Sequence, residues 1–162
     1  MNKNDMQIDY KTVQLFREIA QIVAPPPILT VSQWADRYRR LSAESAAEPG
    51  QWNTDRAPYQ RDIMDAVNDP DCEEVVIMSS AQVGKTELIL NTIGYYIDYD
   101  PAPILVVQPT LEMAQAFSKD RLAPMIRDKP ALSGKVKDST SRNSGNTILP
   151  KKFPGGHTHI PH

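Results

Sequence analysis

The stretch EEVVIMSSAQVGKTELILNT, residues 73–92, decides which fold the sequence predicts. Residues 75–78 are all apolar and predict a short buried strand. The loop 79–86 follows and ends in Gly-Lys-Thr, and residues 87–90 predict the start of a helix. A strand, a tight loop ending in Gly-Lys-Thr and a helix form the context that a phosphate-binding P-loop requires.

Each part of this loop has a physical task at a phosphate group. Backbone N–H groups of the loop surround the phosphate, and the helix N-terminus adds partial positive charge. Gly84 lets the backbone approach without a Cβ in the way. Lys85 is expected to reach the β- and γ-phosphates as the catalytic residue, and the Thr86 hydroxyl is expected to bind Mg²⁺. Glu87 either tunes the magnesium site or is an acidic residue that the helix dipole favours.

The loop departs from the usual G-x-x-x-x-G-K-[ST] pattern, because Ser79 stands where the first glycine is expected. The alternative interpretation is an ordinary strand-to-helix turn with an exposed lysine. The apolar strand before the loop and the helix after it favour nucleotide binding.

Composition and charge bound the class of protein. With 162 residues, 40% of them hydrophobic and 23% charged, the chain is expected to be one soluble globular domain. A net charge of −2 neither favours nor excludes binding to nucleic acid. The single cysteine, Cys72, indicates a reducing compartment and is expected to be an apolar filler. No apolar run is long enough for a membrane span, and the N-terminal residues MNKNDMQIDY do not form the apolar core that a signal peptide is expected to have.

Helical periodicity predicts an amphipathic helix over residues 10–23, ended by three prolines. A capping box of Thr30 and Gln33 predicts a second short helix, and residues 58–69 predict a third. Residues 104–107 predict another apolar strand. Strand, helix and strand at this spacing form a βαβ unit, which predicts an α/β fold with a parallel sheet.

The last third of the chain has weaker patterns. A helix is expected after Thr110, with Pro124 ending or kinking it. Residues 128–146 are polar and are expected to be irregular and disordered, residues 147–149 predict a short strand, and 153–156 predict a turn. Three histidines fall within the last six residues, which are expected to be a tail and not a metal site, because no acidic residue or cysteine lies nearby.

Several segments together resemble one family, the large terminase subunit of tailed phages of the lambda-like gpA type. They are VSQWADRYRRLS, APYQRDIMDA, VVIMSSAQVGKTE, ILVVQPTLEMAQAFSKDRLAPMI and KKFPGG, between about residues 28 and 156. The resemblance implies a P-loop NTPase fold of the RecA and helicase type, preceded by short N-terminal helices. It implies the ATPase of a motor that packages viral DNA into procapsids, with ATP and Mg²⁺ as cofactors.

The resemblance also implies roles for individual residues. The Walker A loop would be Ser79, Ser80, Ala81, Gln82, Val83, Gly84, Lys85 and Thr86. Tyr59 and Gln60 would contact the adenine, and packing of Tyr59 in the core is the alternative. Lys119 and Arg121 are candidate contacts to DNA phosphates, and a solvated helix face is the alternative.

By this resemblance residues 1–50 form an N-terminal helical region that contacts the small terminase subunit. Residues 51–156 form part of the ATPase domain, and 157–162 form a tail. The family's Walker B Asp-Glu pair follows the turn at 153–156, and nothing after Gly156 supplies it. The chain is therefore expected to be an N-terminal fragment that is inactive alone. Its two strands are not neighbours in the family's sheet, so each is expected to lack partners.

Double-stranded viral DNA, the small subunit and the portal of the procapsid are the implied partners, in the host cell cytoplasm and without a membrane. Two other functions remain open from the sequence. The chain is alternatively a module that only binds the small subunit, or part of a different, helicase-like P-loop ATPase.

Overall fold

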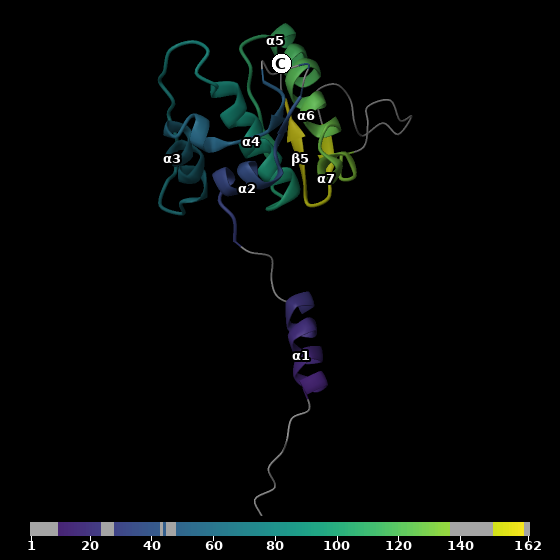
Figure 1. The fold of residues 1–162 in the computed structure, drawn as a ribbon. Helices are drawn as coiled ribbons and strands as arrows, with labels where there is room; N and C mark the ends of the chain where they lie inside the picture. Colours follow the sequence, from purple (N-terminus) through teal and green to yellow (C-terminus); the bar gives the residue numbers. More distant parts are fainter. Residues whose placement is uncertain (1–9, 24–27, 43, 45–47, 137–150, 161–162) are drawn as a thin grey trace, which may run out of the picture.

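The computed structural model describes residues 10–23, 28–42, 44, 48–136 and 151–160 of the chain. Helix α1 (Tyr10–Val23) forms where the apolar spacing predicts it and lies apart from the other helices in Figure 1. Four of its large apolar side chains are exposed, with exposed fractions from 46% at Ile19 to 76% at Tyr10. Helix α1 therefore presents an apolar face that the rest of the described chain leaves uncovered.

The capping box predicted for the second helix is present at the start of α2 (Val31–Tyr38). The Gln33 N–H donates to Thr30 Oγ1, and the Thr30 N–H donates to Gln33 Oε1 at 3.2 Å. Trp34 of this helix is fully buried against Gly94 of α4 (Lys85–Asp98), where an added Cβ would lie 2.4 Å from the indole. Gly94 thus lets α2 and α4 approach closely.

Helix α4 packs into two separate apolar clusters, one on each side. Leu88 and Tyr95 join the first cluster, with residues of α2 and of α3 (Tyr59–Asp65). Leu90, Ile93 and Ile97 join the second, which includes Val106, Ala114, Phe117, Leu122, Met125, Ile126, Leu132, Val136, Phe153 and Ile160. Burial of two faces makes α4 the central element of the fold.

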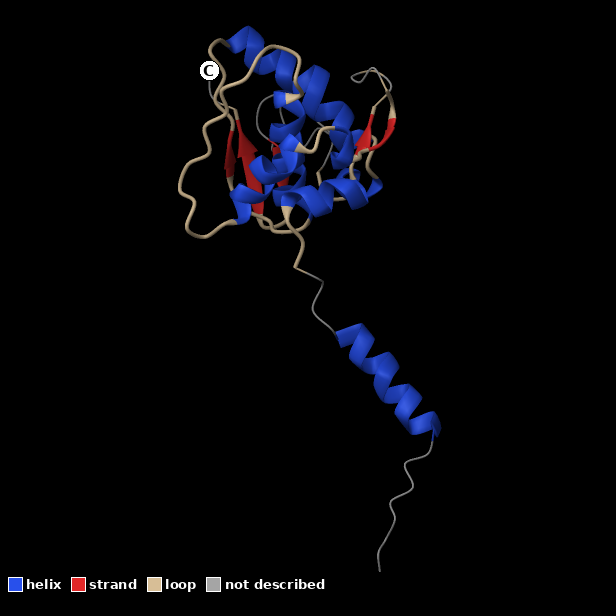
Figure 2. Ribbon diagram, turned by 60° about the vertical axis from the view of Figure 1, so that its left-hand side comes forward, coloured by secondary structure: helices blue, strands red, loops and turns tan. Residues whose placement is uncertain are grey.

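Two small sheets lie at opposite sides of the helices in Figure 2. Strands β1 (Arg40–Leu41) and β2 (Gly50–Gln51) form an antiparallel pair. The second sheet has the order β3-β5-β4, in which β3 (Ile104–Leu105) is parallel to β5 (Gly156–His159) and β5 is antiparallel to β4 (Lys151–Phe153). The mixed α/β class is confirmed, but this sheet is mixed and not purely parallel.

The strand predicted at residues 75–78 is not formed. Residues 72–80 have no regular secondary structure, and Val76 and Met78 have exposed fractions of 78% and 96%. A strand needs a neighbouring backbone that completes its hydrogen-bond ladder, and no described strand pairs with this segment. An apolar groove of about 380 Å³ is lined by Val75 and Ile77 of this segment and by residues 104–108, among others. The prediction of a buried strand is therefore wrong, because an apolar run alone supplies neither a neighbouring strand nor a surface that covers it.

The tail predicted at residues 157–162 is corrected for the part that the structure describes. Residues 156–159 form the central strand β5, in which Thr158 is fully buried, and Ile160 beyond it is fully buried too. His157 and His159 alternate with them and are exposed, which is the period-2 pattern of a strand with one buried face. His162 and the strand predicted at 147–149 lie outside the described residues.

The chain after Thr110 stays helical for longer than predicted. Helix α5 (Leu111–Ala116) continues through a π-helical turn (Phe117–Leu122) into α6 (Ala123–Arg127), so Pro124 does not end the helix. Residues 129–136 are corrected from irregular to partly helical: α7 (Pro130–Ser133) forms there, and Leu132 and Val136 are buried. Short 3₁₀ turns occupy Thr54–Arg56 and Ala66–Asn68. No helix in these described ranges is long and apolar enough to cross a membrane.

Candidate functional site

The loop 79–84 leads directly into the first turn of α4. Gly84 is the N-cap of this helix with φ +85°, and no side chain caps it. The first N–H groups of a helix have no partner within the helix, and the helix dipole places partial positive charge there. The end of α4 that carries Lys85 and Thr86 is therefore suited to an anion such as a phosphate.

The Lys85 side chain lies across the loop. Its Nζ donates to the carbonyl oxygens of Ser79, at 3.3 Å, and of Ser80. The structure thus brings Ser79, Ser80 and Lys85 together, as predicted for one binding loop. Ser79, Ser80, Ala81, Gln82 and Thr86 are exposed, whereas Val83, Gly84 and Lys85 are half-buried.

Gln82 has a left-handed backbone, with φ +61°. L-residues other than glycine, asparagine and aspartate rarely adopt this conformation, because the Cβ approaches the carbonyl oxygen. Strain of this kind clusters at functional sites. The loop therefore contains two residues with positive φ, Gln82 and Gly84, separated by Val83.

Tyr59 and Gln60 lie 24 and 23 residues before Val83 of the loop, and both contact it. The Tyr59 hydroxyl donates to the Val83 carbonyl oxygen at 3.0 Å, and Gln60 Nε2 donates to the same atom at 2.9 Å. The Tyr59 ring is exposed, whereas Gln60 has an exposed fraction of 3%. The structure therefore places both residues at the predicted loop.

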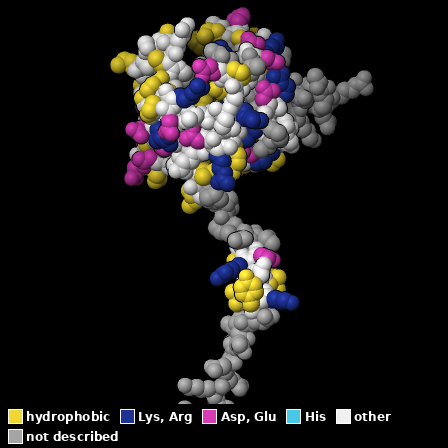
Figure 3. Space-filling view, in the orientation of Figure 1, with side chains coloured by type: hydrophobic (Ala, Val, Ile, Leu, Met, Phe, Trp, Pro, Cys, Tyr) yellow, Lys and Arg dark blue, Asp and Glu magenta, His cyan; other side chains and the backbone are white. Residues whose placement is uncertain are grey.

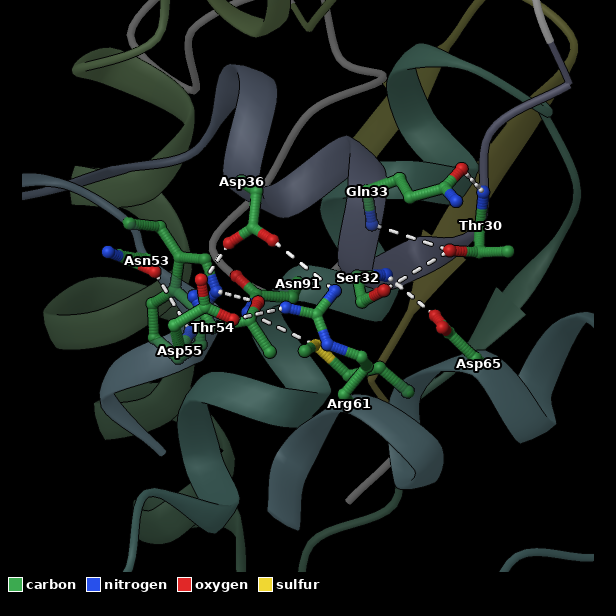
Figure 4. Close-up of polar contacts among 12 residues, drawn as sticks. Thr30, Ser32, Gln33, Asp36, Asn53, Thr54, Asp55, Arg61, Asp65 and Asn91 are labelled. Carbon is green, nitrogen blue, oxygen red and sulfur yellow. Dashed lines mark hydrogen bonds and ion pairs between the residues drawn. The ribbon is translucent and has the colours of Figure 1, made fainter. Parts of the chain in front are cut away.

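Helix α3, which carries these two residues, is held in place by polar contacts with α2 (Figure 4). Asp65 Oδ1 accepts from the Ser32 N–H at 3.1 Å, so α3 supplies a partner to an N–H group in the first turn of α2 that the capping box does not reach. Arg61 pairs with Asp36 of α2 at 3.8 Å and with Asp55 at 2.7 Å. These contacts fix where α3 begins relative to the loop.

A buried ion pair, which sequence reasoning missed, lies beside the loop. Arg39 follows α2 and has a side-chain exposed fraction of 2%, and its guanidinium pairs with Glu87 of α4 at 3.0 Å. Burial lowers the pKa of Arg39, while the charge of Glu87 and its hydrogen bond act to raise it. Glu87 therefore has a structural partner. The two residues are far apart in the sequence, and no local pattern links them.

An open cleft of about 490 Å³ adjoins the first turn of α4. Thr86 lines it, together with Gln108 at the end of the β3 segment and Asp120 and Arg121 of the π-helical turn. Among the described residues, no group of three or more His, Cys, Asp or Glu side chains is placed to hold a metal ion. In Figure 3 basic and acidic side chains are interspersed over one face of the molecule.

The opposite end of α4 carries a second charged cluster. Asp98 Oδ2 accepts from Lys129 Nζ at 2.6 Å and from Trp34 Nε1 at 3.0 Å, and Asp98 Oδ1 accepts from Lys135 Nζ at 2.9 Å. Burial acts to raise the pKa of Asp98, but these hydrogen bonds outweigh burial and lower it. This cluster ties α4 to α2 and to the α7 region.

Comparison with known proteins identifies one family. Residues 46–162 match the family described as the phage terminase large subunit gpA, ATPase domain. The terminase large subunit of Enterobacteria phage P21 is 33% identical over 138 residues, which cover 85% of this chain and 21% of that protein. The terminase large subunit of Escherichia phage lambda is 31% identical over 156 residues, covering 96% of this chain and 24% of that protein. No solved structure shows a significant match.

The chain thus spans between about a fifth and a quarter of the length of these two relatives. The family match begins before α3 and includes Tyr59, Gln60, the loop 79–86, α4 and all strands of the second sheet. It covers well over half of the chain, and the resemblance seen in the sequence is confirmed: the chain belongs to the family of phage terminase large subunits and matches its ATPase domain.

Proposed function

We propose that the loop 79–86 binds the phosphates of ATP with Mg²⁺, as the ATP-binding part of a motor that packages viral DNA into procapsids. One observation carries this: the uncapped first turn of α4 with the ammonium group of Lys85 lying across the preceding loop. A helix N-terminus, inward backbone donors and a lysine together neutralise a polyphosphate. Nucleotide contacts come from Ser79, Ser80, Ala81, Gln82, Val83, Gly84, Lys85 and Thr86.

In this proposal Lys85 is the catalytic residue of the described chain. Its ammonium neutralises charge that develops on the transferred phosphoryl group. Thr86 holds Mg²⁺ through its hydroxyl, since it is exposed on the cleft that borders the loop. Mg²⁺ in phosphate-transfer sites keeps several waters and uses few protein ligands besides the substrate phosphates. Thr86 would supply one protein ligand, and the ion would shield the negative charge of the phosphates when bound.

Tyr59 is proposed to stack on the adenine, because its ring is exposed while its hydroxyl is anchored at the loop. The adenine contact predicted for Gln60 stays a prediction, and a different role for this residue is argued below. Packing in the core, the alternative for Tyr59, is not supported by a ring of which 57% is exposed.

The partners of the whole motor are proposals for this chain. Double-stranded viral DNA, the small terminase subunit and the procapsid portal are proposed to meet it in the host cytoplasm. The family match is the support. Lys119 and Arg121 on the π-helical turn remain candidate contacts to DNA phosphates, and Arg121 also lines the cleft beside Thr86.

A second candidate function, binding of a partner protein, is favoured by α1. Its exposed apolar face suits a partner helix that would cover it. The region 1–50 is accordingly proposed to contact the small terminase subunit. This function does not compete with nucleotide binding, because α1 and the loop are separate parts of the chain.

Calorimetric titration with ATP and Mg²⁺ tests the proposed function. Lys85→Ala is expected to weaken ATP binding by about tenfold or more, since hydrogen bonds and ion pairs to charged groups contribute about 1.5–3 kcal/mol. Arg56→Ala is the matched control, because Arg56 is exposed and pairs only with exposed Glu48 among the contacts described. Equal binding by Lys85→Ala and the unmodified chain, or no binding by either, would reject the assignment.

A further inference from the structure

The Val83 carbonyl oxygen accepts two hydrogen bonds from consecutive residues at the start of α3. The donors are the Tyr59 hydroxyl at 3.0 Å and Gln60 Nε2 at 2.9 Å. Both side chains come from outside the loop and converge on one atom within it. The direction of this one carbonyl group is therefore set by α3 and not by the loop's own backbone.

The direction of that carbonyl determines where the next N–H group points. The described chain contains no cis peptide bond, so the Val83–Gly84 peptide is trans. In a planar trans peptide the C=O and N–H groups point in opposite directions. Holding the Val83 oxygen toward α3 therefore directs the Gly84 N–H away from α3. That N–H immediately precedes Lys85, at the end of α4 where a phosphate is proposed to bind.

Gln60 is also fitted to Gly84 itself. A Cβ added to Gly84 would lie 2.6 Å from Gln60 Nε2, too close for any real contact. Gly84 has φ +85°, a backbone conformation that also favours glycine. The absence of a side chain at position 84 is thus what lets the Gln60 amide reach the Val83 oxygen.

The Gln60 amide is too buried to contact a ligand without moving. The residue has an exposed fraction of 3%, and its Oε1 is buried without a hydrogen-bond partner among the described residues. A glutamine amide has a second N–H and an oxygen besides the donor that reaches Val83, but both belong to a side chain that is almost fully buried. To pair with a base edge, Gln60 would have to move outward, whereas the exposed Tyr59 ring would not have to move.

We propose that Gln60, assisted by the Tyr59 hydroxyl, is a positioning residue that orients the Gly84 N–H toward a bound phosphate, and that Gln60 does not read the base. The inference rests on the proposed function, since it assigns a role within the same site. It extends that function by making the polyphosphate, whatever nucleoside it carries, the part of the ligand that responds to Gln60.

Binding of three ligands separates this role from recognition of adenine. ATP, GTP and inorganic tripolyphosphate are titrated, each with Mg²⁺, into the full chain and its Gln60→Met and Tyr59→Phe variants. Methionine keeps the buried volume and removes the donor, and phenylalanine keeps the ring and removes only the hydroxyl. Each is expected to weaken all three ligands by the same factor, between about threefold and tenfold for one lost hydrogen bond. Asp62→Ala, on an exposed position of α3, is the control and is expected to change none of them.

A selective loss for ATP, with GTP and tripolyphosphate unchanged, would overturn the inference in favour of contact with adenine. Unchanged binding of all three ligands by both variants would overturn it as well. Tyr59→Phe keeps the test decisive if Gln60→Met does not fold, because Tyr59 is exposed and its hydroxyl is dispensable for packing.

A nucleotide-free measurement distinguishes failure of this inference from failure of the proposed function. In ¹H–¹⁵N spectra of the chain without ligand, both variants are expected to shift the Gly84 and Lys85 amide signals and to leave that of Ile97 unchanged. If the unmodified chain binds no nucleotide, the proposed function fails, and the Gly84 signal still tests the orientation of the peptide. An unmoved Gly84 signal in both variants would overturn the inference on its own.

Discussion

Helix α4 begins at Lys85 and ends at Asp98, and its two ends differ in how far their polar groups are paired within the chain. At Asp98 the carboxylate receives hydrogen bonds from Lys129, Lys135 and Trp34. At the Lys85 end the first turn has no side-chain cap, and the loop before it contains residues with positive φ. Paired charges stabilise the fold, whereas unpaired donors and backbone strain are features of a binding site. The buried Arg39–Glu87 ion pair is a paired charge of this structural kind, although it lies near the proposed binding loop.

The largest expected effect comes from breaking the paired end. Asp98→Ala removes the carboxylate that pairs with the ammonium group of Lys129. The Lys129 side chain has an exposed fraction of 6%, so the substitution leaves a buried positive charge without its partner. The expected loss is about 3–5 kcal/mol of the free energy of unfolding, measured by urea denaturation. Asp100→Ala, on an exposed neighbour, is expected to change it by less than about 0.5 kcal/mol. Similar denaturation midpoints for both variants would show that the two ends do not differ as described.

Acid should weaken the paired end selectively. The pKa of Asp98 in the folded chain lies below its ordinary value, because hydrogen bonds from Lys129, Lys135 and Trp34 outweigh burial. The contribution of Asp98 to stability is therefore fully present above its unfolded pKa and is lost as the pH falls through the folded pKa. The difference in unfolding free energy between the unmodified chain and Asp98→Asn is expected to shrink between about pH 6 and about pH 2. A difference that stays constant over this range would contradict the pairing.

The smallest expected effect concerns backbone strain at the binding end. Gln82→Gly relieves a left-handed conformation that costs about 1–2 kcal/mol, but glycine also raises the entropy of the unfolded chain by an amount worth about 0.5–1 kcal/mol. The net gain in thermal or urea stability is expected to lie between about 0 and about 1.5 kcal/mol. Gln82→Ala keeps the Cβ and serves as the control, so it should show no gain. A clear destabilisation by glycine would mean that the Gln82 side chain itself supports the loop.

Features set by neighbours along the chain could be predicted from the sequence. The capping box of Thr30 and Gln33 and the start of α4 after Gly84 depend on residues within one turn of each other. The motif predicted which residues form the loop 79–86. The family resemblance pointed to Tyr59 and Gln60 as residues of the same site. These are local signals, or signals carried by the order of segments.

Features that depend on distant partners could not be predicted. The strand expected at 75–78 was inferred from apolar residues alone, but a strand also requires a neighbouring ladder. Strand β5 was missed because its two exposed histidines concealed the alternation with Thr158 and Ile160. The Arg39–Glu87 pair and the bond from Gln60 to Val83 join residues 48 and 23 positions apart. Such contacts are properties of the packed chain.

The division of the core into two clusters by α4 has a practical optical consequence. The chain has two tryptophans, and both Trp34 and Trp52 belong to the cluster shared with α2 and α3. The cluster shared with β3, β5 and α6 contains no tryptophan among its residues. Indole emission therefore reports the melting of one half of the interior, while far-ultraviolet circular dichroism reports helices on both sides. Coincidence of the two curves measures whether α4 transmits cooperativity between the halves.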